Sequence, residues 1–222
     1  KINQIHGKTL SYNNYNDIFA ALNITVSLPI NAGTVIVKHA NPCGISALKN
    51  NLDSYNSAIN CDPISAYGGI ISCNYKITQK IAIEMSKVFL EVIIAKGFDK
   101  NALKILRLKK NLRLIDASNL KFKELFKLNS IDNFTLIQSE DNKKISRKNF
   151  EIVSKKRPNK SQFENLIFAF NMCRYVKSNA IVIASNKSTV GIGSGQPSRL
   201  DSCEIAINKM NKFTNPRNEI VA

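Results

Sequence analysis

Apolar and amphipathic stretches alternate along most of this chain. Short aliphatic runs predict strands at residues 34–38, 68–73, 91–95, 113–116, 180–184 and 189–195. Apolar positions at helical spacing predict helices over residues 52–60, 78–88 and 99–107, from Ser161 onward, and from about 199 to 211. Strands separated by helices favour crossover connections, so the pattern predicts an α/β fold with mainly parallel sheets.

Residues 117–160 interrupt this pattern. They are polar and rich in lysine, with one short apolar run at 134–137. We interpret the region as a polar linker or an edge hairpin. It separates a first lobe, residues 1–116, from the start of a second lobe, residues 161–222, whose C-terminal part we expect to be missing.

The composition, 44% hydrophobic over 222 residues, is that of a globular protein. The longest apolar run, near residues 88–96, is much shorter than the roughly 20 residues of a membrane span. The first residues also lack the pattern of a secretory signal, so we expect a cytoplasmic protein. Five cysteines at wide spacings, without a C-x-x-C pair, predict reduced thiols.

The formal net charge of +16 raises the question of a nucleic-acid partner. Only 7 of the 32 basic residues are arginine, and the densest runs, at 104–110, 143–148 and 155–160, mostly lack interleaved aromatic residues. Base readout and stacking favour arginine and aromatic side chains, so nucleic acid is a disfavoured partner. The basic charge is then either compositional drift on a solvated face or a surface for other polyanions.

Two stretches resemble known site motifs only in part. HANPCGIS, residues 39–46, shares the spacing of a zinc deaminase signature, but Asn41 and Ser46 replace its glutamate and second cysteine, so no metal is predicted. GIGSGQPSR, residues 191–199, places Gln196 where a dinucleotide fingerprint needs glycine. Its backbone N–H groups could receive an anion before a helix, or its glycines could serve a tight turn.

Lys38 and His39 stand together at the end of a predicted strand. If the chain splays out into Asn-Pro-Cys-Gly, both side chains can reach one cleft. Histidine can take up and release protons near neutral pH. The alternative is a hydrogen-bonded histidine at the edge of the core, and the spacing alone leaves both interpretations open.

Several stretches match one family in order: VKHANPCG, CDPISAYGGIIS, LEVIIAKG, VKSNAIVIA and VGIGSGQPSRLDS, preceded by GKTLSYNNYNDIFAAL. They resemble the formyltransferase domain of the bifunctional AICAR transformylase/IMP cyclohydrolase family, from about residue 4 to residue 210. The resemblance implies a cytidine-deaminase-like α/β/α sandwich with two similar lobes. It also implies a homodimer with a shared active site.

The activity implied by this resemblance belongs to purine (IMP) biosynthesis. 10-Formyltetrahydrofolate, the cosubstrate, gives its formyl group to the 5-amino group of aminoimidazole carboxamide ribonucleotide (AICAR). By motif position, His39 corresponds to the catalytic proton acceptor and Lys38 to a neighbouring cation near phosphate or an oxyanion. Asn179 and Arg199 correspond to residues that hold the base and its carboxamide. Gly68 corresponds to a glycine that lets the backbone approach the ligand, and Glu91 to an acidic nucleotide contact.

Parts of the family pattern lie outside these residues. They are the cyclohydrolase domain, an arginine-containing segment before the first residue and an SDAFFPF-like segment after the last. We therefore expect either an excerpt of a longer protein or a truncated product, and we assign no cyclohydrolase activity to this chain. The alternative function is a non-catalytic remnant, or a basic polyanion-binding module, that keeps the same fold.

Overall fold

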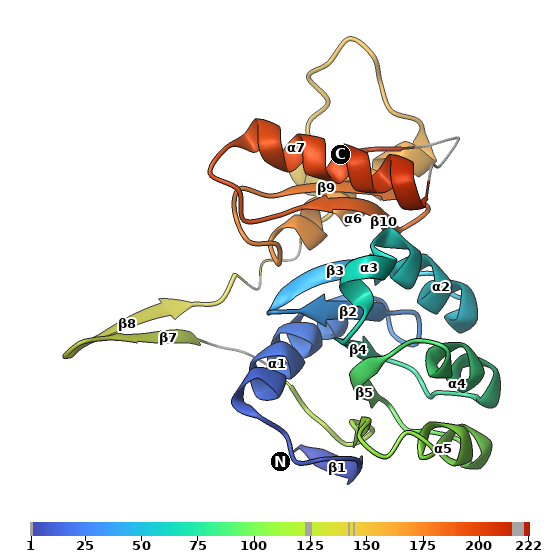
Figure 1. The fold of residues 1–222 in the computed structure, drawn as a ribbon. Helices are drawn as coiled ribbons and strands as arrows, with labels where there is room; N and C mark the ends of the chain where they lie inside the picture. Colours follow the sequence, from blue (N-terminus) through green and yellow to red (C-terminus); the bar gives the residue numbers. More distant parts are fainter. Residues whose placement is uncertain (1, 123–125, 142, 144, 215–219) are drawn as a thin grey trace.

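The computed structural model describes residues 2–122, 126–141, 143, 145–214 and 220–222. Within them, an eight-stranded sheet carries helices on both faces, as the α/β prediction required (Figure 1). Its strands are β1 (Asn3–His6), β2 (Thr34–Lys38), β3 (Asn41–Ser46), β4 (Gly69–Cys73), β5 (Leu90–Ala95), β6 (Arg113–Asp116), β9 (Ile181–Ser185) and β10 (Ser188–Gly193). The helices are α1 (Tyr12–Ser27), α2 (Asn51–Cys61), α3 (Pro63–Ala66), α4 (Gln79–Ser86), α5 (Lys100–Leu106), α6 (Lys160–Cys173) and α7 (Arg199–Phe213).

The sheet has the strand order β1-β6-β5-β4-β2-β3-β10-β9. The prediction of parallel pairing is confirmed for β4, β5 and β6, which the crossover helices α4 and α5 connect. The other neighbouring strands pair antiparallel. Strands β2 and β4 pair antiparallel because β3 follows β2 directly as a hairpin and reverses the chain once more before β4.

Strand β3 corrects one expectation from the sequence. The interpretation in which the chain splays out after Lys38 is wrong, because residues 41–46 pair with β2. Pro42 lies opposite Val37, beside an irregularity in the register. Gly44 is needed for packing, since a Cβ atom there would lie 1.8 Å from the carbonyl oxygen of Ala58 in α2. The turn-like letters of this stretch therefore belong to a strand that lies directly under a helix.

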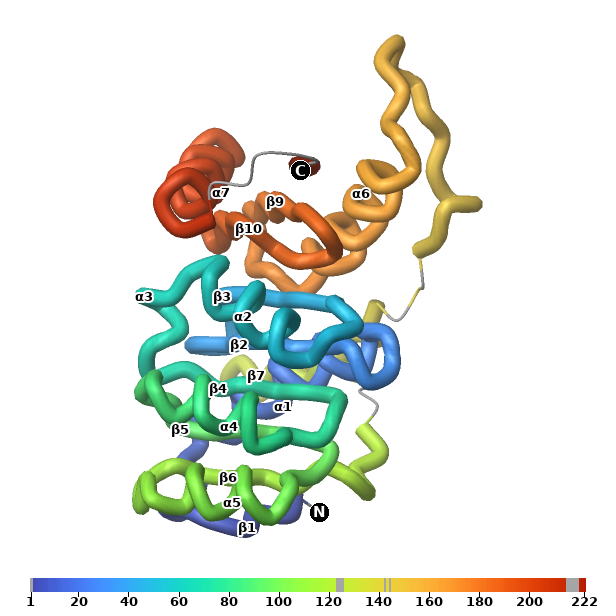
Figure 2. Tube along the Cα trace, turned by 90° about the vertical axis from the view of Figure 1, so that its right-hand side faces the viewer, coloured from blue at the N-terminus to red at the C-terminus, as the bar shows by residue number. Residues whose placement is uncertain are grey.

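Helices cover the two faces of the sheet in two groups. Helices α1 and α6 pack on one face, where Ile18 and Phe168 join the same core cluster as Val37. Helices α2, α3, α4 and α5 cover the other face, where Tyr55 packs in one cluster with Ile93. Figure 2 shows α6 and α7 on opposite sides of β9 and β10. The molecule is thus a three-layer α/β/α sandwich.

The predicted first and second lobes share this one sheet. β3 meets β10 at Ser46 and Ser188, whose hydroxyl oxygens lie 2.8 Å apart. The N–H of Ile45 donates to Oγ1 of Thr189 at 2.9 Å, and the N–H of Ala47 donates to the carbonyl of Lys187 at 2.9 Å. Both lobes therefore present their strand ends along the same sheet edges.

The region between the lobes contains a separate hairpin of β7 (Phe126–Ile131) and β8 (Phe134–Ser139), which extends away from the main sheet (Figure 1). A short 3₁₀ helix, Arg147–Asn149, follows it. Residues 123–125, 142 and 144 of the predicted linker, and 215–219 of the predicted second lobe, lie outside the described residues. In the described part of the chain, no helix is long and apolar enough to cross a membrane.

Candidate functional site

The turn between β2 and β3 consists of His39 and Ala40. Both residues adopt the left-handed backbone conformation, with φ values of 52° and 58°, as in a two-residue type I′ hairpin turn. Such turns favour asparagine and glycine, and each of these residues costs roughly 1–2 kcal/mol here. The side chain of Asp17 offsets this cost, because its two carboxylate oxygens accept the N–H groups of His39 and Ala40 at 3.0 and 2.7 Å. The turn is therefore held in place while His39 itself is exposed.

Lys38 ties this turn to the segment before β4. Its Nζ atom donates a hydrogen bond to the carbonyl of Tyr67 at 2.8 Å. The next residue, Gly68, has a φ of 74°, and its N–H donates to the carbonyl of Phe89 at 2.8 Å. A left-handed residue at this point favours glycine. Lys38 and Gly68, both predicted site residues, thus lie in one group with His39.

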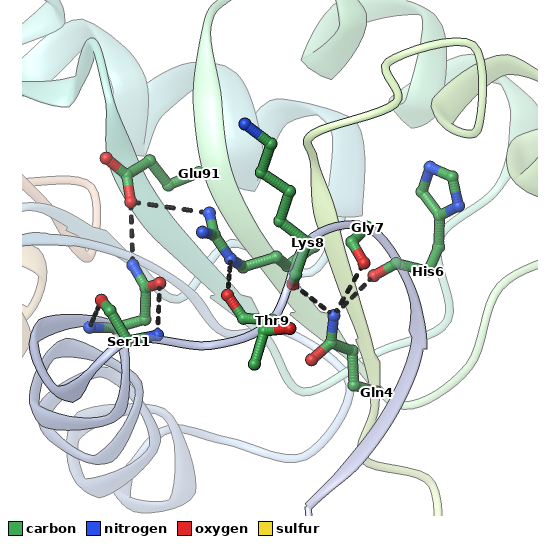
Figure 3. A network of polar contacts seen from close by, with 9 residues as sticks. Gln4, His6, Gly7, Lys8, Thr9, Ser11 and Glu91 are labelled. Carbon is green, nitrogen blue, oxygen red and sulfur yellow. Dashed lines mark hydrogen bonds and ion pairs between the residues drawn. The ribbon is translucent and has the colours of Figure 1, made fainter.

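Glu91, at the start of β5, belongs to the same region. Figure 3 shows its carboxylate in two contacts: Oε2 accepts from Nδ2 of Asn14 at 2.8 Å and lies 3.8 Å from Nη1 of Arg113. The segment before α1 folds around Gln4, whose amide donates to the carbonyl of Lys8 at 2.7 Å (Figure 3). Arg113 also donates to the carbonyl of Thr9 at 3.1 Å. Glu91 is therefore fixed by protein groups, with 42% of its side chain still exposed.

Asn179 and Arg199 form a second group. The amide nitrogen Nδ2 of Asn179 donates to the carbonyls of Gln196 and Pro197 at 2.9 and 2.7 Å. Arg199 is exposed at the first position of α7. The hydroxyl of Ser198 already caps this helix by accepting the N–H groups of Leu200 and Asp201. The side chain of Asn179 thus fixes the turn that leads to Arg199.

The glycines of GIGSG serve two different purposes. A Cβ atom at Gly191 or Gly193 would lie about 2 Å from a carbonyl oxygen of α7, so these two glycines allow the helix to lie on the strand. Gly195 alone among them has a left-handed φ, of 69°. The turn interpretation therefore applies to Gly195, and the other two glycines are explained by packing.

All six predicted site residues lie along one edge of the sheet. Because β2 and β10 run opposite to β4, β5 and β9, the end of β2 and the starts of β4, β5 and β9 share that edge. The N–H of Lys177 donates to Oδ1 of Asn41 at 3.3 Å and connects the two groups. Three strand spacings separate β2 from β9, and together they amount to a distance of about 14 Å across the sheet. The predicted residues therefore share one edge in two separate groups.

A well-formed cavity lies elsewhere. Its volume is about 350 Å³, it is mainly apolar, and it is bounded by α6, the start of β9 and residues 150–158. None of the six predicted residues lines it. The candidate site is therefore the strand edge with its hydrogen bonds, and the cavity is separate from it.

The cysteines near the turn are structural. Burial raises the pKa values of Cys43 and Cys61 to about 12, so both are neutral thiols at neutral pH. Among the residues that the structure describes, no three His, Cys, Asp or Glu side chains group as metal ligands would. In the same part of the chain, all five cysteines are free.

Sequence reasoning missed Asp17 and Asn14. They are three residues apart and therefore share one face of α1, and both reach predicted site residues. The available signal was a pair of short polar side chains, Asp17 directly before the buried Ile18 and Asn14 about one helical turn earlier. That pattern alone does not say which strand end the polar pair meets.

The fold and this edge define the class as a three-layer α/β/α protein that presents a lysine–histidine turn. The chain belongs to the AICARFT/IMPCHase bienzyme family, whose sequence pattern matches residues 1–209.

Three of the proteins that this chain is similar to carry the name bifunctional purine biosynthesis protein PurH and come from bacteria. That of Acetivibrio thermocellus is 39% identical over 207 residues, and that of Parvibaculum lavamentivorans is 42% identical over 210 residues. The relative from Buchnera aphidicola subsp. Schizaphis graminum is 45% identical over 206 residues. These matches cover 92, 93 and 92% of this chain and 40, 39 and 39% of the respective relatives. The chain thus spans about 40% of the length of the relatives it matches.

Proposed function

We propose that this chain carries the formyltransferase site of a purine-biosynthesis enzyme, with AICAR as acceptor and 10-formyltetrahydrofolate as formyl donor. The family and the name shared by its relatives support the pathway. The observation that carries the proposal is His39, an exposed imidazole on a turn that Asp17 holds at the sheet edge.

The proposed chemistry is an acyl transfer. The 5-amino nitrogen of AICAR attacks the formyl carbon, a new C–N bond forms, and the bond from that carbon to N10 of the folate breaks. His39 accepts the proton that the amine loses and passes it to the departing N10, so that one proton leaves the amine and one reaches the folate. The amine is conjugated with the imidazole ring and is a weak nucleophile, which is why a positioned base accelerates the step.

Lys38 supplies positive charge beside this step. Its ammonium has three N–H donors, and the bond to Tyr67 uses one of them. The others are available to the oxygen of the tetrahedral intermediate or to the phosphate of the nucleotide.

The second group holds the nucleotide in this proposal. Both N–H donors of Asn179 are used within the protein, so its oxygen is the atom that would accept the carboxamide N–H of AICAR. Arg199 would donate to the base or the carboxamide oxygen. The carboxylate of Glu91 would accept a hydrogen bond from a hydroxyl group of the ribose. Gly68, which has no side chain, would leave room for the ligand beside the backbone.

We further propose a homodimer formed through the hairpin β7–β8. Partners across an antiparallel ladder share a face, so both faces of this hairpin carry apolar side chains. Each of these side chains is more than half exposed: Phe126, Leu128 and Ile137 on one face, and Ile131, Phe134 and Leu136 on the other.

The exposed area suits a second copy of the chain. At roughly 100 Å² for each side chain, the hairpin exposes on the order of 300 Å² of apolar surface on each face, comparable with the largest patch of a typical monomer. A standard interface buries about 800 Å² on each partner. An isolated two-stranded hairpin is marginal in water, and a two-fold axis would let two hairpins cover each other.

The central test compares the only two histidines of the sequence. Formyl transfer is followed by tetrahydrofolate absorbance in the full-length protein and in its His39→Ala and His6→Ala variants. We expect His39→Ala to lower kcat by 10² to 10⁴, the usual contribution of a positioned base. His6 is the matched control, because its ring contacts the carbonyl of Lys109 at 3.3 Å near the far end of the strand order.

Activity of His39→Ala within a factor of about ten of the parent would overturn the proton-transfer role. A similar loss in both variants would point to a general effect of histidine removal. Melting temperatures recorded beside the rates separate that case from loss of catalysis.

A further inference from the structure

We propose that Asp17 is a positioning residue for His39, acting through the backbone of the turn. The inference rests on the proposed function of His39 and adds a residue from a different element. Asp17 lies on α1, 22 positions before the histidine, and is half-buried.

The contact is made by both carboxylate oxygens. Oδ2 accepts the N–H of His39 at 3.0 Å, and Oδ1 accepts the N–H of Ala40 at 2.7 Å. Hydrogen bonds to a carboxylate group are stronger than those to a neutral oxygen. Two bonds to consecutive N–H groups fix both the position and the tilt of the turn.

The turn requires such support because of its own sequence. His39 and Ala40 both adopt left-handed φ values that side-chain-bearing residues rarely take. Asn41 adds one more bond, from its Nδ2 to the carbonyl of His39 at 3.1 Å. Without Asp17, this bond and the pairing of Lys38 with Asn41 at the end of the ladder would be left to restrain the histidine's backbone.

Helix α1 gives Asp17 a fixed base. The neighbouring Ile18 is fully buried in the core between α1 and the sheet. The helix begins with a capping box between Ser11 and Asn14, and Asn14 also holds Glu91. One face of α1 thus sets the positions of His39 and Glu91 together.

A positioning role predicts a particular kinetic result. Displacement of a catalytic group by about 1 Å can cost 10²-fold in rate. We therefore expect Asp17→Ala in the full-length protein to lower kcat about 100-fold with little change in KM. Asp17→Asn, which keeps one acceptor oxygen, should fall between this variant and the parent. Asp53→Asn is the matched control, because Asp53 is an exposed acid in the first turn of α2.

A second substitution separates positioning from stability. Glycine takes left-handed conformations without strain, so Asp17→Ala combined with Ala40→Gly should recover melting temperature. It should not recover kcat, because glycine relieves the strain without holding the turn. Recovery of both quantities would show that Asp17 only stabilises the fold and would overturn the proposal.

Amide hydrogen exchange gives a readout that does not depend on activity. The N–H groups of His39 and Ala40 should exchange at least ten times faster in Asp17→Asn, with the rest of the sheet unchanged. Unchanged exchange at both amides, or an unchanged kcat in Asp17→Ala, overturns the positioning role. If His39→Ala is itself active, the proposed function fails and the catalytic role of Asp17 fails with it. The exchange rates then still show whether Asp17 holds the turn.

Discussion

Single glycines determine how closely α7 can approach β10. A Cβ atom at Gly193 would lie 1.8 Å from the carbonyl oxygen of Ser202, which belongs to the helix backbone and cannot rotate away. We expect Gly193→Ala to lower the free energy of unfolding by about 3 kcal/mol, the upper range for overpacking. Urea denaturation measures this, with Ser194→Ala, next in sequence and half-buried, as control. A change below about 0.5 kcal/mol in Gly193→Ala would contradict the packing argument.

At this residue scale, the sequence alone could single out Lys38 and His39 but could not decide their role. The resemblance named six residues, and the structure places all of them on one sheet edge. Asp17 could not be predicted, because its partners are backbone N–H groups 22 and 23 residues away. A contact with a backbone group leaves no requirement on the partner's side chain, so no pattern in the letters reveals it.

Among the elements, α3 and α7 are joined by one largely buried ion pair. Lys209 of α7 lies 2.8 Å from the carboxylate of Asp62, whose side chain is 4% exposed and also caps α3 through Ser65. Burial alone would raise the pKa of Asp62, but the hydrogen bonds from Lys209 and Ser65 outweigh it and lower that pKa. The pair therefore stabilises the fold above the unfolded-state pKa of about 3.9 and is lost as the pH falls through the lower folded value.

We expect Lys209→Met to cost about 3 kcal/mol at pH 7, because it leaves a buried carboxylate without its partner. Burial then dominates, the folded pKa of Asp62 rises, and acid unfolding begins at a higher pH than in the parent. Urea denaturation between pH 3 and pH 7 measures both effects. Lys87→Met, which breaks the exposed pair with Glu84, is the control and should change stability by less than about 1 kcal/mol. Equal acid profiles in parent and Lys209→Met would contradict the assignment.

The elements themselves were largely predictable. Buried strands such as β5 and amphipathic helices such as α6 follow directly from apolar spacing, because burial on one or both faces dictates it. Strand β3 was not predictable, since Asn-Pro-Cys-Gly is a typical turn composition. Its pairing comes from tertiary packing under α2, and it changes the direction of β2 relative to β4.

Over the whole molecule, one continuous sheet runs from β1 to β9. Strand ends from the first and the second lobe therefore lie along the same edge of this sheet. The bonds between β3 and β10 place the region after residue 160 beside the lysine–histidine turn. The sequence predicted two lobes, but it could not predict that they join through the pairing of β3 with β10. That pairing depends on β3 being the outermost strand of the first lobe on this side. The strand order then decides which predicted residues lie near one another.

The hairpin β7–β8 tests the proposed dimer at this scale. Because Leu128 and Leu136 lie on opposite faces and are 69 and 57% exposed, Leu128→Asp with Leu136→Asp places a charge on each apolar face. We expect this double variant to shift the full-length protein from dimer to monomer in analytical ultracentrifugation at micromolar concentration. The reason is that an unpaired charge buried in an interface opposes association by several kcal/mol. The control is Leu108→Asp, which places a charge at an exposed leucine after α5, outside the hairpin. A double variant as dimeric as the parent, or a parent that is monomeric at the same concentration, would contradict the proposed interface. If the dimer completes the site, formyl transfer by the double variant should rise with protein concentration, while its circular dichroism spectrum stays that of the parent.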